Sequence, residues 1–184
     1  MIKLIVTDFD GTLVDTFEAN YQAYKYAFEY VNLTLSKDQY RECFGLRFDD
    51  FMKKMNITDD NVKEQIHSIK THVYKKFFNT LNINLDLCNF LYHCKKQNIK
   101  ICLASTAKKE NIDAIINRFK IFDLFDFIIC GNDVKHPKPD PEIYIIAQDR
   151  FGVDSDEMLI FEDSDVGVSA AHRVTSNIIQ IKKF

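Results

Sequence analysis

Short apolar runs recur along this chain, and they alternate with stretches in which apolar residues repeat at helical spacing. Such runs are typical of strands buried on both faces, and strands that alternate with helices form parallel sheets. The pattern predicts strands at Ile2–Thr7, Ile99–Ala104, Phe127–Cys130, Met158–Phe161 and Asn177–Ile181. It predicts helices between them at Leu85–Lys96, Lys108–Phe119, Pro141–Phe151 and Asp165–Arg173. The expected fold class is therefore α/β, a parallel five-stranded sheet sandwiched by helices.

The segment from Asp15 to about Thr80 has helical periodicity and almost no strand pattern. Its two apolar stripes consist of Phe17, Tyr21, Tyr24 and Phe28, and of Val62, Ile66, Ile69, Val73 and Phe77. We therefore expect a discontinuous α/β core domain of residues 1–14 and 82–184, interrupted by a small α-helical domain of residues 15–81.

The composition of the chain limits the kinds of molecule that it is expected to bind. The chain has 184 residues, 46% of them hydrophobic, which is enough for a full core, and its net charge of -3 gives no basic surface for nucleic acid. No apolar segment reaches the roughly 20 residues of a membrane span, and no signal-peptide pattern opens the sequence. We expect a cytoplasmic protein with a small-molecule partner, without nucleic acid or membrane. The five cysteines lack a CxxC pair and are expected to be buried free thiols.

The first predicted strand leads directly into Asp8-Phe9-Asp10-Gly11-Thr12-Leu13. Parallel sheets bind ligands beyond the carboxyl ends of their strands, so Asp8 and Asp10 should both lie in that crevice. Two neighbouring carboxylates repel each other unless a cation or a shared proton lies between them. The pair therefore predicts a divalent metal or a shared proton, and suggests chemistry on phosphate.

Two further strand ends carry polar groups that the same crevice would collect. Ser105 and Thr106 follow the second strand, and their hydroxyls and backbone N–H groups could hold phosphoryl oxygens. The alternative for Ser105 is a plain helix N-cap. Glu162 and Asp163 follow the fourth strand, and four acidic side chains meeting there would favour Mg²⁺ with its oxygen ligands. For Asp163, too, a helix N-cap is the alternative.

The third strand leads to Lys138, which lies between Pro137 and Pro139. Proline rigidity would fix the direction of this lysine, and its charge could neutralise a phosphoryl group. A solvated loop lysine is the alternative. His136 is a weaker candidate, and a solvent-facing position suits it better.

Taken in order, these motifs resemble those of the haloacid dehalogenase superfamily of phosphotransferases. The shared features are DxDGT after strand one, Ser/Thr after strand two, a lysine before a helix, and an acidic pair after strand four. Leu103-Ala104-Ser105 and Glu162-Asp163-Ser164-x-x-Gly167-x-x-Ala170-Ala171 look most like the β-phosphoglucomutase and phosphoglycolate phosphatase branch. The resemblance implies a Rossmann-like core with a helical cap inserted after the first motif.

The resemblance also implies roles for the strand-end residues. Asp8 would be the nucleophile that forms an aspartyl phosphate, and Asp10 would protonate the leaving oxygen and later activate water. Mg²⁺ would be held by Asp8, the Asp10 carbonyl and Asp163, with Glu162 tuning or joining that set. Ser105 and Lys138 would bind the transferring phosphoryl group.

The cap is expected to set specificity through Gly45-Leu46-Arg47-Phe48, which resembles the substrate-facing loop of this branch. Arg47 is the candidate substrate contact. The alternative is that Arg47 is simply exposed while Phe48 packs within the cap. By the same resemblance, Phe48 stands where β-phosphoglucomutases carry an arginine, unless Arg47 replaces it after a one-residue shift. This departure weakens the mutase interpretation.

Three functions remain open at this level. The first is a Mg²⁺-dependent phosphatase of a small phosphorylated metabolite, a sugar phosphate or a phosphoglycolate-like compound. The second is a sugar phosphomutase, and the third is a catalytically silent binding protein on the same scaffold. The family commonly adds a helix after the last strand, and this sequence ends at Phe184. An exposed sheet face there would promote dimerisation, so a monomer and a homodimer both stay open.

Overall fold

The computed structural model describes residues 1–182 and 184. They form two compact units, one of Met1–Asp15 with Ile83–Phe184 and one of Thr16–Asn82. We refer to these as the α/β unit and the helical unit. Among the described residues, no helix is both long and apolar enough to cross a membrane.

The α/β unit contains a five-stranded sheet in the order β5-β4-β1-β6-β7, and every neighbouring pair is parallel. Its strands are β1 (Leu4–Thr7), β4 (Lys100–Ala104), β5 (Phe127–Ile129), β6 (Met158–Glu162) and β7 (Ile178–Gln180). The predicted fold class is confirmed. The predicted strand ends differ by one or two residues: β1 begins two residues later than predicted, and β6 continues one residue past its apolar run to Glu162.

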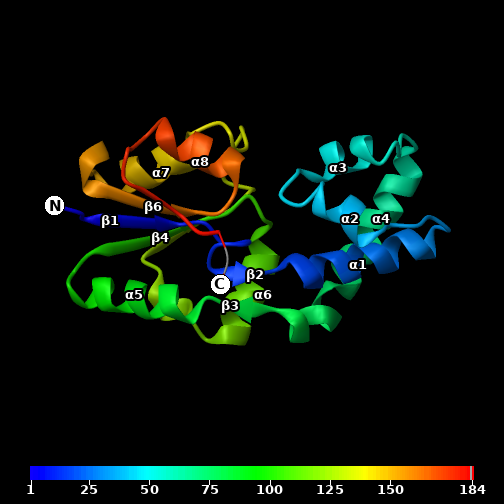
Figure 1. Cartoon of the computed structure of the whole chain (residues 1–184), viewed down its shortest axis with the longest axis horizontal. Helices are drawn as coiled ribbons and strands as arrows, with labels where there is room; N and C mark the ends of the chain where they lie inside the picture. The colour runs from blue at the N-terminus through cyan, green and yellow to red at the C-terminus, as the bar shows by residue number, and fades with distance from the viewer. Residues whose placement is uncertain (183) are drawn as a thin grey trace. The chain divides into compact units, whose positions relative to one another are not determined.

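Helices cover both faces of this sheet (Figure 1). They are α5 (Leu85–Lys96), α6 (Lys109–Phe119), α7 (Glu142–Phe151) and α8 (Asp165–His172), with short 3₁₀ turns η2 (Phe122–Leu124) and η3 (Ser155–Glu157). Figure 1 shows α7 and α8 on one face and α5 on the other. The face under α7 and α8 holds a buried apolar cluster that includes Val6, Ala104, Tyr144 and Ile160.

The strand register decides where the site forms. Thr7 at the end of β1 lies opposite Leu103 of β4 and Phe161 of β6. β1 ends at Thr7, and β4 and β6 each continue one residue further, so the three strands end within one residue of each other. The chain passes from β1 to β4 on one side and returns to β6 on the other, and such a switch in strand order opens a crevice at the carboxyl edge.

The helical unit contains α1 (Phe17–Tyr30), α2 (Lys37–Arg41), α3 (Phe48–Lys54), α4 (Asp60–Val73) and the 3₁₀ helix η1 (Tyr74–Thr80). Short strands β2 (Val14–Asp15) and β3 (Asn82–Ile83) pair where the chain leaves and re-enters the α/β unit. The core of the helical unit is largely aromatic, and Tyr40 contacts both Tyr24 and Phe51. The predicted second stripe extends too far, because α4 ends at Val73 and Phe77 lies in η1.

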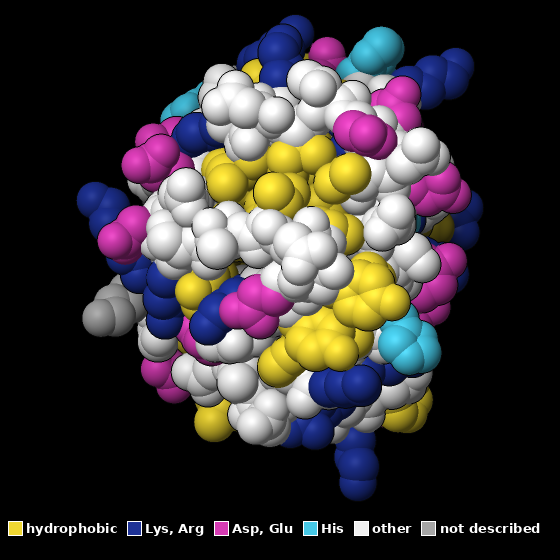
Figure 2. Space-filling model, turned by 90° about the vertical axis from the view of Figure 1, so that its right-hand side faces the viewer, with side chains coloured by type: hydrophobic (Ala, Val, Ile, Leu, Met, Phe, Trp, Pro, Cys, Tyr) yellow, Lys and Arg dark blue, Asp and Glu magenta, His cyan; other side chains and the backbone are white. Residues whose placement is uncertain are grey.

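The surface carries apolar patches among interspersed acidic and basic side chains, as one face shows (Figure 2). Exposed apolar residues of the helical unit include Tyr26, Tyr30 and Leu33. The cysteines are free and buried, as predicted from their apolar neighbours: Cys43, Cys88, Cys94, Cys102 and Cys130.

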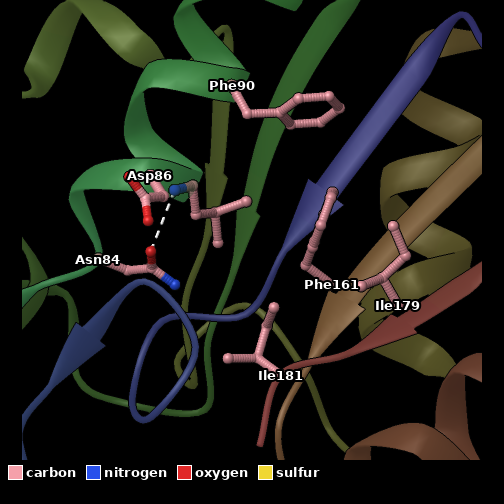
Figure 3. A pocket seen from close by; sticks show the side chains of 7 residues that line it. Asn84, Asp86, Phe90, Phe161, Ile179 and Ile181 are labelled. Atoms are coloured by element: carbon pink, nitrogen blue, oxygen red, sulfur yellow. Dashed lines mark hydrogen bonds between the residues drawn. The ribbon is translucent and has the colours of Figure 1, made fainter. Parts of the chain in front are cut away.

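One groove of about 300 Å³ opens between α5 and the β6–β7 side of the sheet. Phe90, Phe161, Ile179 and Ile181 line it with apolar side chains, and Asn84 turns its carbonyl oxygen to the N–H of Leu87 at the rim (Figure 3). The sheet is thus less completely covered on this face than under α7 and α8.

Candidate active site

The first motif forms a tight loop at the carboxyl end of β1. The Asp8 N–H donates to the carbonyl of Phe161 at 2.9 Å, which ties the end of β1 to β6. The loop then folds back on itself, because the Gly11 N–H donates to the Val14 carbonyl at 2.8 Å. Asp8 is buried and Asp10 is half-buried. The two carboxylates therefore have different surroundings, which suits different protonation roles.

Ser105 enters the site directly from β4. It is buried, its hydroxyl donates to Asp10 Oδ2 at 3.3 Å, and its oxygen accepts from the Ala107 N–H at 3.0 Å. The alternative of a helix N-cap is wrong, since Lys108 holds the N-cap position of α6. Thr106 is exposed, so of these two neighbouring hydroxyls it is that of Ser105 that the structure brings onto a carboxylate.

Lys138 reaches the site from the loop before α7. Its Nζ donates to Asp8 Oδ1 at 2.6 Å and also to Glu162 Oε1, and its side chain is 7% exposed. Lys138 is thus a buried lysine and not the solvated one that its loop position suggests. The loop is anchored by Glu142, whose carboxylate accepts from the N–H groups of Lys135 at 2.9 Å and His136 at 2.7 Å. The side chain of His136 is exposed.

Lys138 is held as a cation between two carboxylates. Burial opposes its charge, but Asp8 and Glu162 keep the pKa of Lys138 well above its ordinary value. Burial also raises the pKa of Asp8, and the ammonium of Lys138 opposes that rise. The site therefore gathers acidic charge that a cation stabilises.

Glu162 is completely buried at the end of β6. Its Oε2 accepts from the Asp163 N–H at 3.0 Å and from the N–H and hydroxyl of Ser164, each at 3.2 Å. A Cβ on Gly167 would lie 2.0 Å from the Glu162 carboxyl carbon, so only glycine fits beside this carboxylate. Glu162 is fixed in place as the partner of Lys138.

Asp163 lies beside the first motif. Its Oδ1 accepts from the buried hydroxyl of Thr12 at 3.1 Å, and a Cβ on Gly11 would lie 2.2 Å from its Oδ2. Burial and the neighbouring Glu162 raise the pKa of Asp163 to about 6. The N-cap alternative for Asp163 is wrong as well, because Ser164 caps α8 by accepting from the Gly167 N–H.

Asp8, Glu162 and Asp163 each offer an oxygen, and these oxygens lie within 4.8 Å of one another. Carboxylate oxygens at this spacing suit a hard divalent cation such as Mg²⁺. The raised pKa of Asp163 points the same way, since a cation would relieve the repulsion that disfavours its ionised form. The donor set therefore fits a metal ion.

The predicted specificity residues belong to the helical unit. Gly45 and Arg47 are exposed, and Arg47 precedes the first turn of α3. Phe48 packs on the unit's aromatic core, where its ring meets that of His67 at 5.1 Å. A role for Gly45 or Arg47 in substrate recognition stays a prediction.

Sequence reasoning missed two residues of this site. Thr12 belongs to the first motif, but nothing in its type or spacing pointed to Asp163, which is distant in sequence. Tyr144 lies in the apolar stripe of α7 and reads as a core residue, although its hydroxyl donates to Glu162 Oε1 at 2.8 Å. Both contacts depend on strand order.

Carboxylates, a buried lysine and a serine hydroxyl around one space suit chemistry on a phosphate ester, at the edge where parallel sheets bind ligands. The chain is an enzyme of the phosphoric monoester hydrolase type. It belongs to the haloacid dehalogenase-like hydrolase family, whose model matches residues 5–181. The resemblance inferred from the motifs is therefore confirmed.

Individual relatives agree with this assignment. The chain is 30% identical to a phosphorylated carbohydrates phosphatase of Thermotoga maritima, over 92% of this chain and 80% of that protein. It is 26% identical to the β-phosphoglucomutase of Bacillus subtilis, over 92% and 78%. The solved structure of CbbY from Rhodobacter sphaeroides in complex with phosphate has the same fold, with a TM-score of 0.88 at 23% identity, covering 100% of this chain and 88% of that one.

Proposed function

We propose that this protein is a Mg²⁺-dependent phosphatase that acts on a small phosphorylated sugar through an aspartyl-phosphate intermediate on Asp8. The observation that carries the proposal is the Asp8 carboxylate, which lies 2.6 Å from the Lys138 ammonium beside Asp163 and Glu162. A nucleophilic carboxylate that faces a fixed cation suits attack on an anionic ester.

Asp8 and Asp163 would supply carboxylate ligands for Mg²⁺, and Asp10 would supply its backbone carbonyl. Bound there, Mg²⁺ would offset the repulsion between the Asp8 carboxylate and the phosphoryl oxygens. Glu162 already accepts hydrogen bonds at both of its oxygens, so we assign it to the positioning of Lys138.

In the first step, an Asp8 carboxylate oxygen attacks phosphorus, the bond from phosphorus to the ester oxygen breaks, and Asp10 protonates the departing alcohol. In the second step, Asp10 takes a proton from water, which attacks phosphorus and releases inorganic phosphate and free Asp8. Ser105 and Lys138 hold the phosphoryl oxygens throughout. Ser105 also contacts Asp10 Oδ2, so the same hydroxyl lies beside both the bound phosphoryl group and the residue that transfers the proton.

A phosphatase is favoured over a mutase by the relatives, since the identity is 30% to the carbohydrate phosphatase and 26% to the mutase. Arg47 and Gly45 are proposed to help select the substrate. The name of the carbohydrate phosphatase supports phosphorylated sugars as the first compounds to test.

The test is phosphate release across sugar phosphates, phosphoglycolate, nucleotides and acetyl phosphate, with Mg²⁺ and without a bisphosphate activator. We expect steady release from at least one sugar phosphate, and loss of turnover by at least about a thousandfold in Asp8→Asn. Turnover that requires a sugar bisphosphate would indicate the mutase instead. Full activity in Asp8→Asn would overturn the nucleophile assignment, and an inert wild type would favour a silent binding protein.

A further inference from the structure

Tyr144 is a buried polar residue that the proposed chemistry does not use. It lies in α7, is 0% exposed, and is among the largest fully buried side chains of the protein. Its hydroxyl donates to Glu162 Oε1 at 2.8 Å, and the Lys138 Nζ lies 5.2 Å from the centre of its ring. One side chain therefore touches both partners of the buried ion pair.

The hydroxyl meets Glu162 at a particular oxygen. Oε1 also accepts from Lys138, whereas Oε2 accepts from Asp163 and Ser164. The two carboxylate oxygens are thus fixed by separate sets of donors, and Tyr144 and Lys138 share the first. A second donor on Oε1 draws off part of its negative charge, so that Glu162 orients the ammonium of Lys138 without neutralising it fully.

The aromatic ring adds a second effect. A cation near an aromatic face is stabilised by the ring quadrupole, most strongly where water is excluded. Burial raises the pKa of Tyr144 well above its ordinary value, so the hydroxyl remains a protonated donor. Tyr144 therefore acts on Lys138 in two ways, through Glu162 and through its ring.

We infer that Tyr144 is a positioning residue, which holds Glu162 Oε1 and thereby directs the Lys138 ammonium toward Asp8 and the transferring phosphoryl group. This inference rests on the proposed function. The simpler alternative is that Tyr144 only fills the apolar cluster under α7 and α8, to which it belongs. A phenylalanine would fill that space equally well, so Tyr144→Phe separates the two roles.

The experiment compares wild type, Tyr144→Phe and a control, Tyr92→Phe. Tyr92 lies in α5 of the same unit, and the carboxylate that acts on it is that of Asp123, away from the site. Four quantities are measured: kcat and KM for the best phosphate ester, the Kd of inorganic phosphate by calorimetry, and the thermal midpoint. Phosphate binding does not depend on turnover. An inactive wild type would therefore contradict the proposed function, while the phosphate Kd of Tyr144→Phe would still test this inference.

We expect Tyr144→Phe to lower kcat and weaken phosphate binding by about tenfold each, while the thermal midpoint stays close to that of wild type. Tyr92→Phe should match wild type in kcat and phosphate affinity. Because Tyr144 acts through Glu162, its hydroxyl should matter less once Glu162 is altered. In Glu162→Gln, the added Tyr144→Phe change should therefore cost less than about threefold.

Wild-type kcat and phosphate affinity in Tyr144→Phe would overturn the inference. So would fully additive losses in the double variant, because the hydroxyl would then act independently of Glu162. A Tyr144→Phe protein that does not fold would also count against it, since the hydroxyl would then serve the fold.

Discussion

At the scale of single residues, the site is organised by hydrogen bonds to carboxylate oxygens. The hydroxyl of Thr12 donates a hydrogen bond to Asp163. In the same way, the hydroxyl of Ser105 donates to Asp10, and that of Tyr144 donates to Glu162. Each hydroxyl fixes the direction of one acidic group. Groups that are already oriented need little reorganisation when charge develops on the substrate. This preorganisation is the general origin of electrostatic catalysis.

Thr12 should control metal affinity. Thr12→Val removes the hydroxyl that orients Asp163 and keeps the side-chain shape, so the apparent Kd for Mg²⁺ should rise by about tenfold or more. A Mg²⁺ titration of activity, with calorimetry, measures this. Thr175→Val is the matched control, because its buried hydroxyl accepts from the Asn177 N–H and lies outside the carboxylate cluster. An unchanged Mg²⁺ affinity in Thr12→Val would show that the Thr12 hydroxyl does not prepare Asp163 for the metal.

Substitutions of Ser105 and Thr106 should differ sharply in their effect on kcat/KM, although the two residues are neighbours in the sequence. Ser105→Ala deletes the hydroxyl beside Asp10, and kcat/KM should fall by about ten- to a hundredfold. Thr106→Ala alters an exposed side chain, and its effect should stay within about threefold if only its backbone contributes. Steady-state kinetics on one ester compares them. Equal losses would show that the Thr106 hydroxyl also binds phosphate.

At the scale of elements, Asp8, Ser105 and Glu162 lie where β1, β4 and β6 end, whereas Lys138 comes from the loop before α7. The start of α8 is the most constrained junction, because Gly167 faces the Glu162 carboxylate and Ser164 caps the helix. A helix start packed this tightly against a buried anion leaves no room for a side chain.

Gly167→Ala should therefore damage the site through the helix. The added Cβ would displace Glu162 or α8, and we expect a loss of about 1 to 3 kcal/mol in unfolding free energy with a lower kcat. Ser169→Ala adds no atoms on the exposed side of α8 and serves as the control. Denaturant unfolding and kinetics together test this. A variant as stable and active as wild type would show that the Glu162 pocket is wider than the structure indicates.

Helices and strands are predicted best from the sequence where an apolar pattern is clear and polar or turn residues bound it. The continuous apolar run at Met158–Phe161 predicts the strand β6, and apolar residues at helical spacing predict the helix that begins at Leu85. The helical caps were harder: Ser105 and Asp163 have the residue type of an N-cap, but Lys108 and Ser164 hold those positions. Residue preference for a cap cannot show which of several adjacent candidates the backbone uses.

At the scale of the whole molecule, charge balance links stability to pH. The pKa of Asp163 is about 6 in the folded state against 3.8 ordinarily, so between these values the folded protein binds the extra proton. Ionised Asp163 thus lowers the stability of the metal-free protein above pH 6, by up to about 3 kcal/mol, and this penalty fades as pH falls from 6 toward 4.

Mg²⁺ should act most strongly where Asp163 is ionised. We expect Mg²⁺ to raise the thermal midpoint more at about pH 7.5 than at about pH 5, because a proton competes for the same carboxylate at low pH. Asp163→Asn provides the comparison, since it removes this titration while other carboxylates still respond to acid. A Mg²⁺ effect that is the same at both pH values in wild type would contradict the assignment of Asp163.

The sequence by itself determined the chemical inventory and the class of fold. Apolar runs buried on both faces require a covered parallel sheet, and the polar residues that end those runs must meet at one edge. That logic places Asp8, Asp10, Ser105, Glu162 and Asp163 at one edge of the sheet. The inclusion of Lys138, which lies in a loop, and the role of each residue came from the resemblance to the haloacid dehalogenase superfamily.

Only the tertiary structure decided how these groups are paired. Lys138 contacts both Asp8 and Glu162, Thr12 contacts Asp163, and Tyr144 turns its hydroxyl from the core to the site. These contacts join segments far apart in the chain, and they depend on strand order and register. Local patterns in a sequence do not record such distances, because a side chain's partner is chosen by packing in three dimensions.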